Sequence, residues 1–348
     1  MSVLELDGSY GEGGGQIVRM AVALAALTST SVRVVNVRAK RAKPGLAAQH
    51  ATAIRAVARL CDARVEGADV GSSAFTFTPG PLHGGKVSVD VGTAGSITLV
   101  LQACLPAAFH AGDTELEIRG GTDVPWSPPL DYFGHVFLGL LRKMGGRAEV
   151  EIAMRGYYPR GGGLVRVRVE RAPRWRPLLL PGRGGIVRIA GRAHASNLPE
   201  DVVERMKSAA TRRFAQYTSV RIHSEVLGPD RAVGPGGAIV LWAETPETIL
   251  GASALAEKGK RAERVGDEAA TMLLKEIESR ATLDVHASDQ VLAYAAMASS
   301  PSEFLVRDVT EHARTMMWLL GSFLGTQFHV SSEGGLSRIR VTPSADRL

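Results

Sequence analysis

Three segments of the chain share one order of sequence patterns, and this internal repeat constrains the fold more than any other feature. Each begins with a run of small residues, followed by an apolar helix-like stretch and an alternating strand-like stretch. Each ends with a second helix pattern and two strand patterns. The segments cover residues 11–80, 92–170 and 286–343. The sequence therefore predicts a mixed α/β (α+β) fold in which three repeated βαβαββ units form one large domain, with their helices packed together at the centre.

About a hundred residues separate the second unit from the third, which is near the usual size of a small domain. This stretch starts in the Pro- and Arg-rich segment 172–185 and ends near Arg280. Its patterns predict strands, a helix capped by Ser196 or Asn197, and a charged helix over 262–280. We therefore predict a large domain made of residues 1–181 and 281–348, and a smaller inserted α/β domain at 182–280.

Charge and cysteine content exclude several classes of protein. Lys and Arg number 41 against 35 Asp and Glu, a net charge of +6 that permits an acidic partner such as RNA or a nucleotide without demanding one. Cys61 and Cys104 lie in apolar helical stretches and lack zinc-site or redox spacing, so we expect buried free thiols. The longest apolar run, 20–27, is too short to cross a bilayer, and no signal-peptide pattern is present. We expect a cytoplasmic protein with no membrane partner.

The first glycine-rich run, GSYGEGGGQ, has the composition of a phosphate cradle at a helix N-terminus. It is not a Walker A motif, because no GK[ST] follows, and no strand of normal length precedes it. Glu12 within the run would repel phosphate unless a divalent metal bridged the two. A glycine-rich turn with an exposed glutamate is the alternative interpretation.

A basic loop follows the next strand pattern and contains Arg38 and Arg41. Clustered arginines suit bidentate phosphate recognition, although a merely solvated loop is equally compatible with this segment alone. His50, on the following helix, is more typical of a hydrogen-bonded structural histidine.

The third unit offers the most suggestive side chains. In HASDQ, Asp289 can accept hydrogen bonds from a ribose or adenine and Gln290 can donate to phosphate, or Ser288 or Asp289 can simply cap a helix. In VTEHARTMMWLL, His312 falls in the first turn of an apolar helix with Thr310 as the expected cap. The helix dipole disfavours an imidazolium at that end, so a neutral ring beside an anion site is a candidate nucleophile.

Taken together, six motifs resemble those of the RNA 3′-terminal phosphate cyclases, and in the order of that family. They are SYGEGGGQIVR, RAKRAKPGLAAQH, GGTDVPWSPPLDY, RGYYPRGGG, SDQ and TEH. The resemblance covers nearly the whole chain and includes the inserted domain. It implies an ATP-dependent reaction in three steps: a histidine is adenylylated, AMP passes to an RNA 3′-phosphate, and the neighbouring 2′-OH displaces AMP to leave a 2′,3′-cyclic phosphate.

The resemblance also assigns roles to individual residues. It makes His312 the adenylylated histidine and Glu12 the ligand of a divalent metal, Mg or Mn. Arg38 and Arg41 would bind phosphate. The ATP-contacting residues that it implies are Gln102, His286, Ala287, Ser288, Asp289 and Gln290. The family often has a tyrosine that stacks on adenine where this chain has His286, and an imidazole offers a smaller stacking face.

Two other functions compete with this interpretation. A cyclase-like ribosome-assembly factor that binds RNA without chemistry would lack the nucleophilic histidine, which is present here in TEH. An enolpyruvyl transferase is built from similar repeats but does not carry RGYYPRGGG. The expected partner is therefore RNA with a 3′-terminal phosphate. A monomer and a homodimer are both left open.

Overall fold

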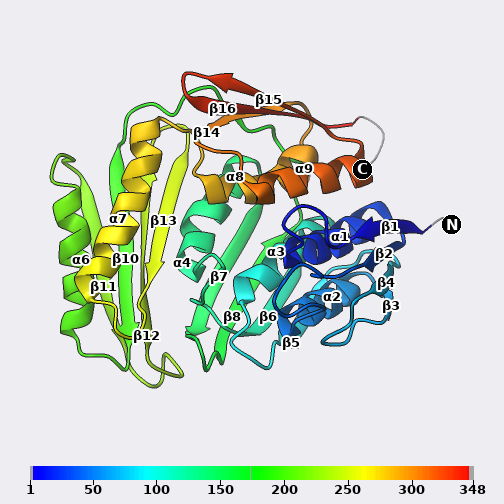
Figure 1. The fold of residues 1–348 in the computed structure, drawn as a ribbon, viewed down its shortest axis with the longest axis horizontal. Helices are drawn as coiled ribbons and strands as arrows, with labels where there is room; N and C mark the ends of the chain where they lie inside the picture. The colour runs from blue at the N-terminus through cyan, green and yellow to red at the C-terminus, as the bar shows by residue number, and fades with distance from the viewer. Residues whose placement is uncertain (1–2, 173, 345–348) are drawn as a thin grey trace.

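Four sheets of four strands each make up the β-structure of the computed structural model, which describes residues 3–172 and 174–344 (Figure 1). Three sheets share one strand order, β1-β2-β4-β3, β5-β6-β8-β7 and β9-β14-β16-β15. In each of them the first pair of strands is parallel and the other two pairs are antiparallel. The mixed α/β class predicted from the sequence is confirmed.

The N-terminal unit contributes the first of these sheets and two helices. Its elements are β1 (Leu4–Asp7), α1 (Gly15–Thr28), β2 (Val32–Val35), α2 (Ala48–Leu60), β3 (Arg64–Glu66) and β4 (Phe75–Thr78). A side chain at Gly15 would meet the His50 ring, with a Cβ only 1.9 Å from Nε2, so a glycine there lets α1 and α2 approach closely. In addition, a short strand, β1, precedes the glycine-rich run.

The second unit follows directly and lies at the centre of the molecule in Figure 1. Its elements are β5 (Gly85–Asp90), α3 (Ile97–Ala111), β6 (Thr114–Gly120), α4 (Leu130–Tyr132), η1 (Phe133–Phe137), α5 (Leu138–Lys143), β7 (Arg147–Met154) and β8 (Gly163–Glu170). Helix α3 is apolar on almost every side and packs against both α1 and α2. A helix that is apolar all round belongs in a core, and this one lies in the main hydrophobic cluster.

The third sheet begins before the insertion. Its elements are β9 (Leu179–Leu180), α8 (Val285–Ala296), β14 (Ser302–Val306), α9 (Glu311–Leu324), β15 (Gln327–Glu333) and β16 (Leu336–Thr342). Leu180 is the register partner of Phe304 on β14, and the Thr282 N–H donates to the neighbouring Leu305 carbonyl at 2.8 Å. The insertion therefore leaves and re-enters the large domain at the same strand.

The inserted segment forms the left side of the molecule in Figure 1 and contributes the fourth sheet. Its elements are β10 (Arg188–Ser196), α6 (Asp201–Arg213), β11 (Val220–Leu227), β12 (Gly236–Glu244), β13 (Ile249–Leu255) and α7 (Ala262–Ser279). Its hydrophobic core, which runs from Ile189 to Ile277, is separate from the main cluster. The inserted segment therefore has a core of its own. The exact boundaries at 182 and 280 stay a prediction. The predicted cap was wrong: α6 begins after Glu200, with no side-chain cap.

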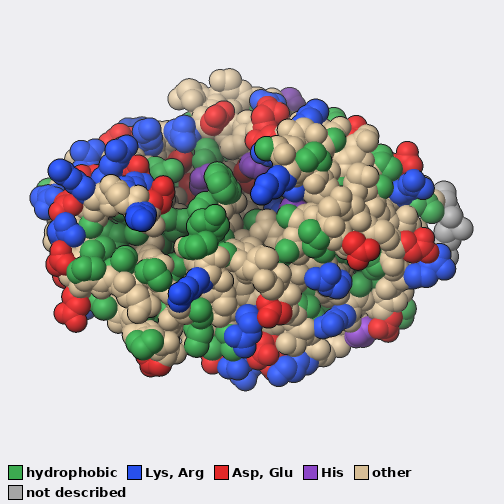
Figure 2. Space-filling model, turned by 60° about the horizontal axis from the view of Figure 1, so that its bottom comes forward, with side chains coloured by type: hydrophobic (Ala, Val, Ile, Leu, Met, Phe, Trp, Pro, Cys, Tyr) green, Lys and Arg blue, Asp and Glu red, His purple; other side chains and the backbone are tan. Residues whose placement is uncertain are grey.

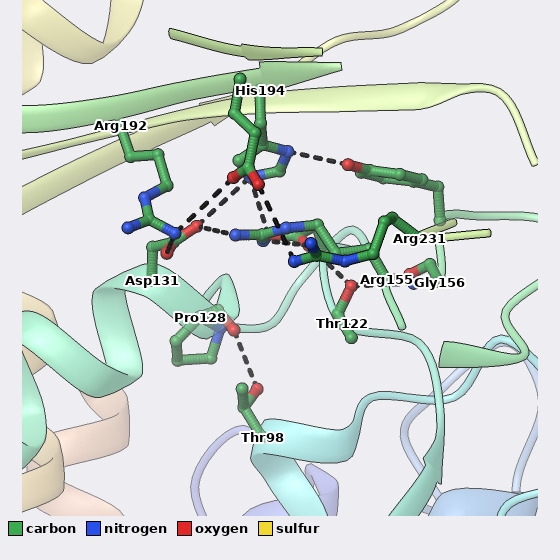
Figure 3. A network of polar contacts seen from close by, with 12 residues as sticks. Thr98, Thr122, Pro128, Asp131, Arg155, Gly156, Arg192, His194 and Arg231 are labelled. Carbon is green, nitrogen blue, oxygen red and sulfur yellow. Dashed lines mark hydrogen bonds and ion pairs between the residues drawn. The ribbon is translucent and has the colours of Figure 1, made fainter. Parts of the chain in front are cut away.

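A buried ion-pair network joins the second unit to the inserted segment (Figure 3). Arg155 donates to Asp123 at 3.1 Å and to Asp131 at 2.7 Å, and His194 on β10 lies 3.3 Å from Asp131. Burial alone would raise the pKa of both carboxyls, but Arg155 and His194 outweigh it and hold both pKa values below the ordinary range. The two carboxylates therefore stay charged and bind the cations of the network.

Two further expectations concern the whole chain. Cys61 and Cys104 are buried free thiols, as predicted. Among the described helices, none combines the length and the hydropathy that crossing a bilayer requires.

Candidate active site

A cavity of about 570 Å³ lies where all three units and the inserted segment meet. The face shown in Figure 2 is hollowed at this junction, where histidine and basic side chains gather. Five of the site residues expected from the sequence line the cavity: Gln102, His286, Asp289, Gln290 and His312. The inserted segment adds an apolar part of the wall from β13 and α7, namely Ala254, Leu255 and Met272.

His312 lies in the first turn of α9, where Thr310 caps the helix by accepting from the Ala313 N–H, as predicted. Its Nδ1 lies 2.9 Å from Oε1 of Gln16, and the amide nitrogen of Gln16 donates to the His312 carbonyl at 3.2 Å. That second bond fixes the amide orientation, so Nδ1 of the ring must carry the proton that Oε1 accepts. In the neutral ring, Nε2 then has a free lone pair.

The protonation of His312 follows from its surroundings. Burial lowers the pKa of the imidazole, the carboxylate of Glu12 raises it, and Arg19 and Arg41 lower it again; the net direction is downward. A ring with a lowered pKa is neutral at pH 7, which is the form a nucleophile needs.

Glu12 connects His312 to the basic loop. Its Oε2 lies 3.2 Å from Nε2 of His312 and 3.1 Å from Nη2 of Arg41. Gly11 and Gly13 on either side have φ near +57°, a conformation that favours glycine and turns the loop around the carboxylate. Arg38, in contrast, donates to the Gly45 carbonyl at 2.8 Å within its own loop. The structure thus brings Glu12, Arg41 and His312 together. Arg38 is bound within its own loop and does not join them.

The HASDQ segment lies inside α8, not ahead of it. The cap is Asp284, which accepts from the His286 and Ala287 N–H groups, so the alternative interpretation of Ser288 or Asp289 as the cap was wrong. His286 is exposed at the cavity, whereas Ala287 and Ser288 are buried. Gln290 accepts from the Gln102 amide at 3.0 Å, which joins α8 to α3.

Asp289 provides the carboxyl group on the described cavity wall, and its pKa is raised. Burial raises its pKa to about 7, a bond donated by Thr310 (2.7 Å) opposes the rise, and the charge of Asp284 adds to it. Its carboxyl therefore changes charge near neutral pH.

Sequence reasoning missed Gln16, Arg19 and Trp126, all of which line the cavity. Burial lowers the pKa of Arg19 to about 10, and within the described part of the chain no hydrogen bond or ion pair reaches its guanidinium. Arg19 is half-buried, and a cation in that position with no protein partner would stabilise an anionic ligand in this cavity. Gln16 and Arg19 are three apart, which puts them on one face of α1 right after the glycine run, and that spacing could have found them.

Two groups of side chains have the donor atoms that a metal ion requires. Asp123, Asp131 and His194 bring three ligand-type atoms within 4.8 Å of one another. Arg155 donates to both carboxylates there, and with an imidazolium it already balances their charge, so this group does not fit a cation. Glu12 offers a hard carboxylate beside the cavity, which suits Mg²⁺ or Mn²⁺ provided that phosphate oxygens and water complete the ligand set.

Comparison with known proteins gives the family of the chain. A family model described as RNA 3′-terminal phosphate cyclase matches residues 10–330. Proteins named RNA 3′-terminal phosphate cyclase are 52% identical in Nitrosospira multiformis (97% of this chain, 96% of the relative) and 45% identical in Methanopyrus kandleri (99% of each). A third, from Pyrococcus furiosus, is 45% identical over 98% of this chain and 99% of the relative.

The fold and the cavity thus define a mixed α/β protein with a candidate site whose wall includes the Arg19 guanidinium and the His312 imidazole. The chain belongs to the RNA 3′-terminal phosphate cyclase family. A solved enolpyruvyl transferase, NikO from Streptomyces tendae, aligns at 13% identity and a TM-score of 0.27, covering 99% of this chain and 66% of that one. This similarity is too low to indicate a shared fold or function.

Proposed function

We propose that this enzyme converts an RNA 3′-terminal phosphate into a 2′,3′-cyclic phosphodiester with ATP as co-substrate, through a covalent histidine–AMP intermediate. The full-length relatives with the cyclase name support the overall reaction. The observation that carries the covalent step is the Gln16–His312 pair, which holds the imidazole with its proton on Nδ1 and its lone pair on Nε2.

In the first step Nε2 of His312 attacks the α-phosphorus of ATP. The new P–N bond forms as the bond to the bridging oxygen breaks, and pyrophosphate leaves with that electron pair. The ring gains positive charge, which the Nδ1–H bond to Gln16 stabilises. Arg19, which has no partner in the described chain, and Arg41 supply positive charge for the phosphates.

In the second step an oxygen of the RNA 3′-phosphate attacks the AMP phosphorus, and the P–N electron pair returns to Nε2. In the third step the 2′-OH loses its proton and attacks the 3′-phosphorus, and AMP leaves. Adenylylation is needed because a phosphate monoester has no good leaving group, whereas its anhydride with AMP does.

The remaining site residues have supporting roles in this proposal. Gln102 and the segment formed by His286, Ala287, Ser288, Asp289 and Gln290 would hold ATP. Arg38 would act on phosphate only after releasing the Gly45 carbonyl. A divalent metal, which Glu12 would hold, supplies charge neutralisation for the triphosphate. We propose the cytoplasm as the compartment of the reaction.

The test is incubation with ATP labelled in its α-phosphate and a divalent metal, followed by denaturing electrophoresis. A labelled protein band that disappears when RNA 3′-phosphate is added, with a cyclic RNA end appearing in its place, supports the proposal. An RNA-binding protein without chemistry would show no labelled band under any condition.

A further inference from the structure

Trp126 is exposed to a degree that is unusual for an indole. Its exposed fraction is 97%, the largest among the exposed large apolar side chains of the described residues, and it still borders the cavity that contains His312. Trp175 and Trp242 are buried, and Trp318 stacks on Tyr10 at 4.0 Å. An indole buries a large apolar area when it is covered, so an uncovered one at a ligand cavity indicates a surface that a ligand covers.

The backbone of the loop that carries Trp126 is held in place. Trp126 has φ of +60°, which bulky side chains rarely adopt, and its loop is fixed on both sides (Figure 3). On one side the Thr122 N–H donates to the Gly156 carbonyl at 2.8 Å. On the other, the Thr98 hydroxyl donates to the Pro128 carbonyl at 2.8 Å.

The buried ion-pair network strengthens the first of these anchors. Asp123, next to Thr122, accepts a hydrogen bond from Arg155, and both side chains are buried. Moving this part of the loop would leave a buried charge without its partner, which is costly. The Ser127 hydroxyl donates to the Val124 carbonyl at 3.0 Å and closes the loop around the tryptophan. A loop backbone that is fixed before the ligand arrives loses less entropy on binding, which favours affinity.

The cavity and its rim suit different parts of one ligand. Inside lie the unpartnered Arg19 guanidinium and the neutral His312, which suit a phosphate. At the mouth lies a flat aromatic face, which suits a base. An enzyme that acts on RNA ends of any sequence needs contacts that every base can make, and stacking on an aromatic ring is such a contact.

We propose that Trp126 is a stacking platform for a base of the last two nucleotides of the RNA substrate. The inference rests on the proposed function, in which four of the ATP-contacting residues line the cavity, namely Gln102, His286, Asp289 and Gln290. The adenine of ATP is therefore expected inside, and the base that reaches the open rim is that of the incoming RNA strand.

The first test measures binding of two 3′-phosphorylated RNA oligonucleotides, one intact and one lacking both of its last two bases. Trp126→Ala is expected to weaken binding of the intact RNA about tenfold and Trp126→Phe much less, since base stacking on an aromatic ring is of that order. Removing the bases should weaken binding to the wild type and have no effect on Trp126→Ala. Tyr158→Ala, another exposed aromatic (66%) outside the cavity, is the matched control and should leave both affinities unchanged.

The second test follows tryptophan fluorescence. Intact RNA without ATP is expected to quench the wild type and not Trp126→Phe, and ATP alone is expected to leave the signal of Trp126 unchanged. Quenching by ATP alone, or an equal cost of base removal in the wild type and in Trp126→Ala, would overturn the inference. Failure of the proposed function would appear separately, as no labelled protein in the ATP experiment.

Discussion

Nε2 of His312 lies 3.2 Å from Oε2 of Glu12, so the start of α9 and the glycine-rich loop before α1 meet at one pair of side chains from opposite ends of the chain. The same carboxylate binds Arg41. In this arrangement Glu12 faces the atom that attacks ATP in the proposed mechanism. The carboxylate must therefore turn away from Nε2 before the reaction, and a metal bound with ATP would draw it away.

Replacing the nucleophile separates the three steps. His312→Ala should form no protein–AMP and should not cyclise an RNA 3′-phosphate, yet it should still cyclise RNA that already carries the 3′-adenylyl group, because that step needs no histidine. In the wild type the labelled bond should be acid-labile and stable to base, as a phosphoramidate is. The matched control is His223→Ala, an exposed histidine on β11. Full labelling of His312→Ala would remove this residue from the mechanism.

Removing the carboxylate should affect both metal use and pH dependence. Glu12→Ala is expected to raise the metal concentration that half-maximal adenylylation requires. Because Glu12 raises the pKa of His312, its loss should also move the acid limb of the adenylylation rate to lower pH. The measurement is the initial labelling rate across metal concentration and pH. If both profiles match the wild type, Glu12 has no part in the site.

Asp289 should make stability depend on pH. Its pKa is about 7 in the folded chain, above its ordinary value near 4, so the folded state binds the extra proton. The associated stability is fully present below pH ~4 and is lost as pH rises through ~7. Asp289→Asn can still accept from Thr310 and should lack this loss. Urea unfolding of both proteins across this range gives the difference in slope, and parallel curves would contradict the assignment.

Breaking the network between the second unit and the inserted segment should be costly. Arg155→Met leaves Asp123 and Asp131 buried without their shared cation, and the free energy of unfolding should fall by about 3–5 kcal/mol. Arg166→Met also removes an arginine paired with two carboxylates, Glu117 and Glu151, but at the surface, and should lower the free energy of unfolding far less. Equal losses in the two variants would mean that burial of the network is not what matters.

Deleting the inserted segment tests how the two parts divide the work. A short glycine linker can join Leu180 to Ala281, because both ends of the segment lie beside β14. Self-adenylylation should survive better than cyclisation, since His312, Gln16 and Glu12 all lie outside the segment. Labelling and cyclisation are measured on one preparation whose fold is checked by circular dichroism. A folded deletion protein that takes up no AMP would assign the inserted segment to the nucleotide site.

Local patterns predicted local structure well. The TEH motif placed Thr310 as the cap and His312 in the first turn of α9, and the charged pattern over 262–280 matches α7, Ala262–Ser279. Helix starts were less predictable: α6 begins after Glu200 with no side-chain cap, and α8 is capped by Asp284, upstream of the Ser288 and Asp289 that were considered.

Long-range contacts could not be predicted from one sequence. The Gln16–His312 pair joins residues from the first and last units, and no periodicity links them. Arg155 belongs to a motif singled out from the sequence, yet an arginine after a strand is typical of a surface. It is buried here because the inserted segment, with His194 on β10 and residues 231–233, packs against it. Strand β9 has two residues, too few for any alternation to register.

The early position of β9 has a consequence for synthesis on the ribosome. This strand emerges more than a hundred residues before β14, the strand that it pairs with in the described part of the third sheet. The inserted segment has its own core and is complete before that neighbour is made. Until then the nascent chain must hold β9 with an unpaired edge, so the third sheet is the last to close.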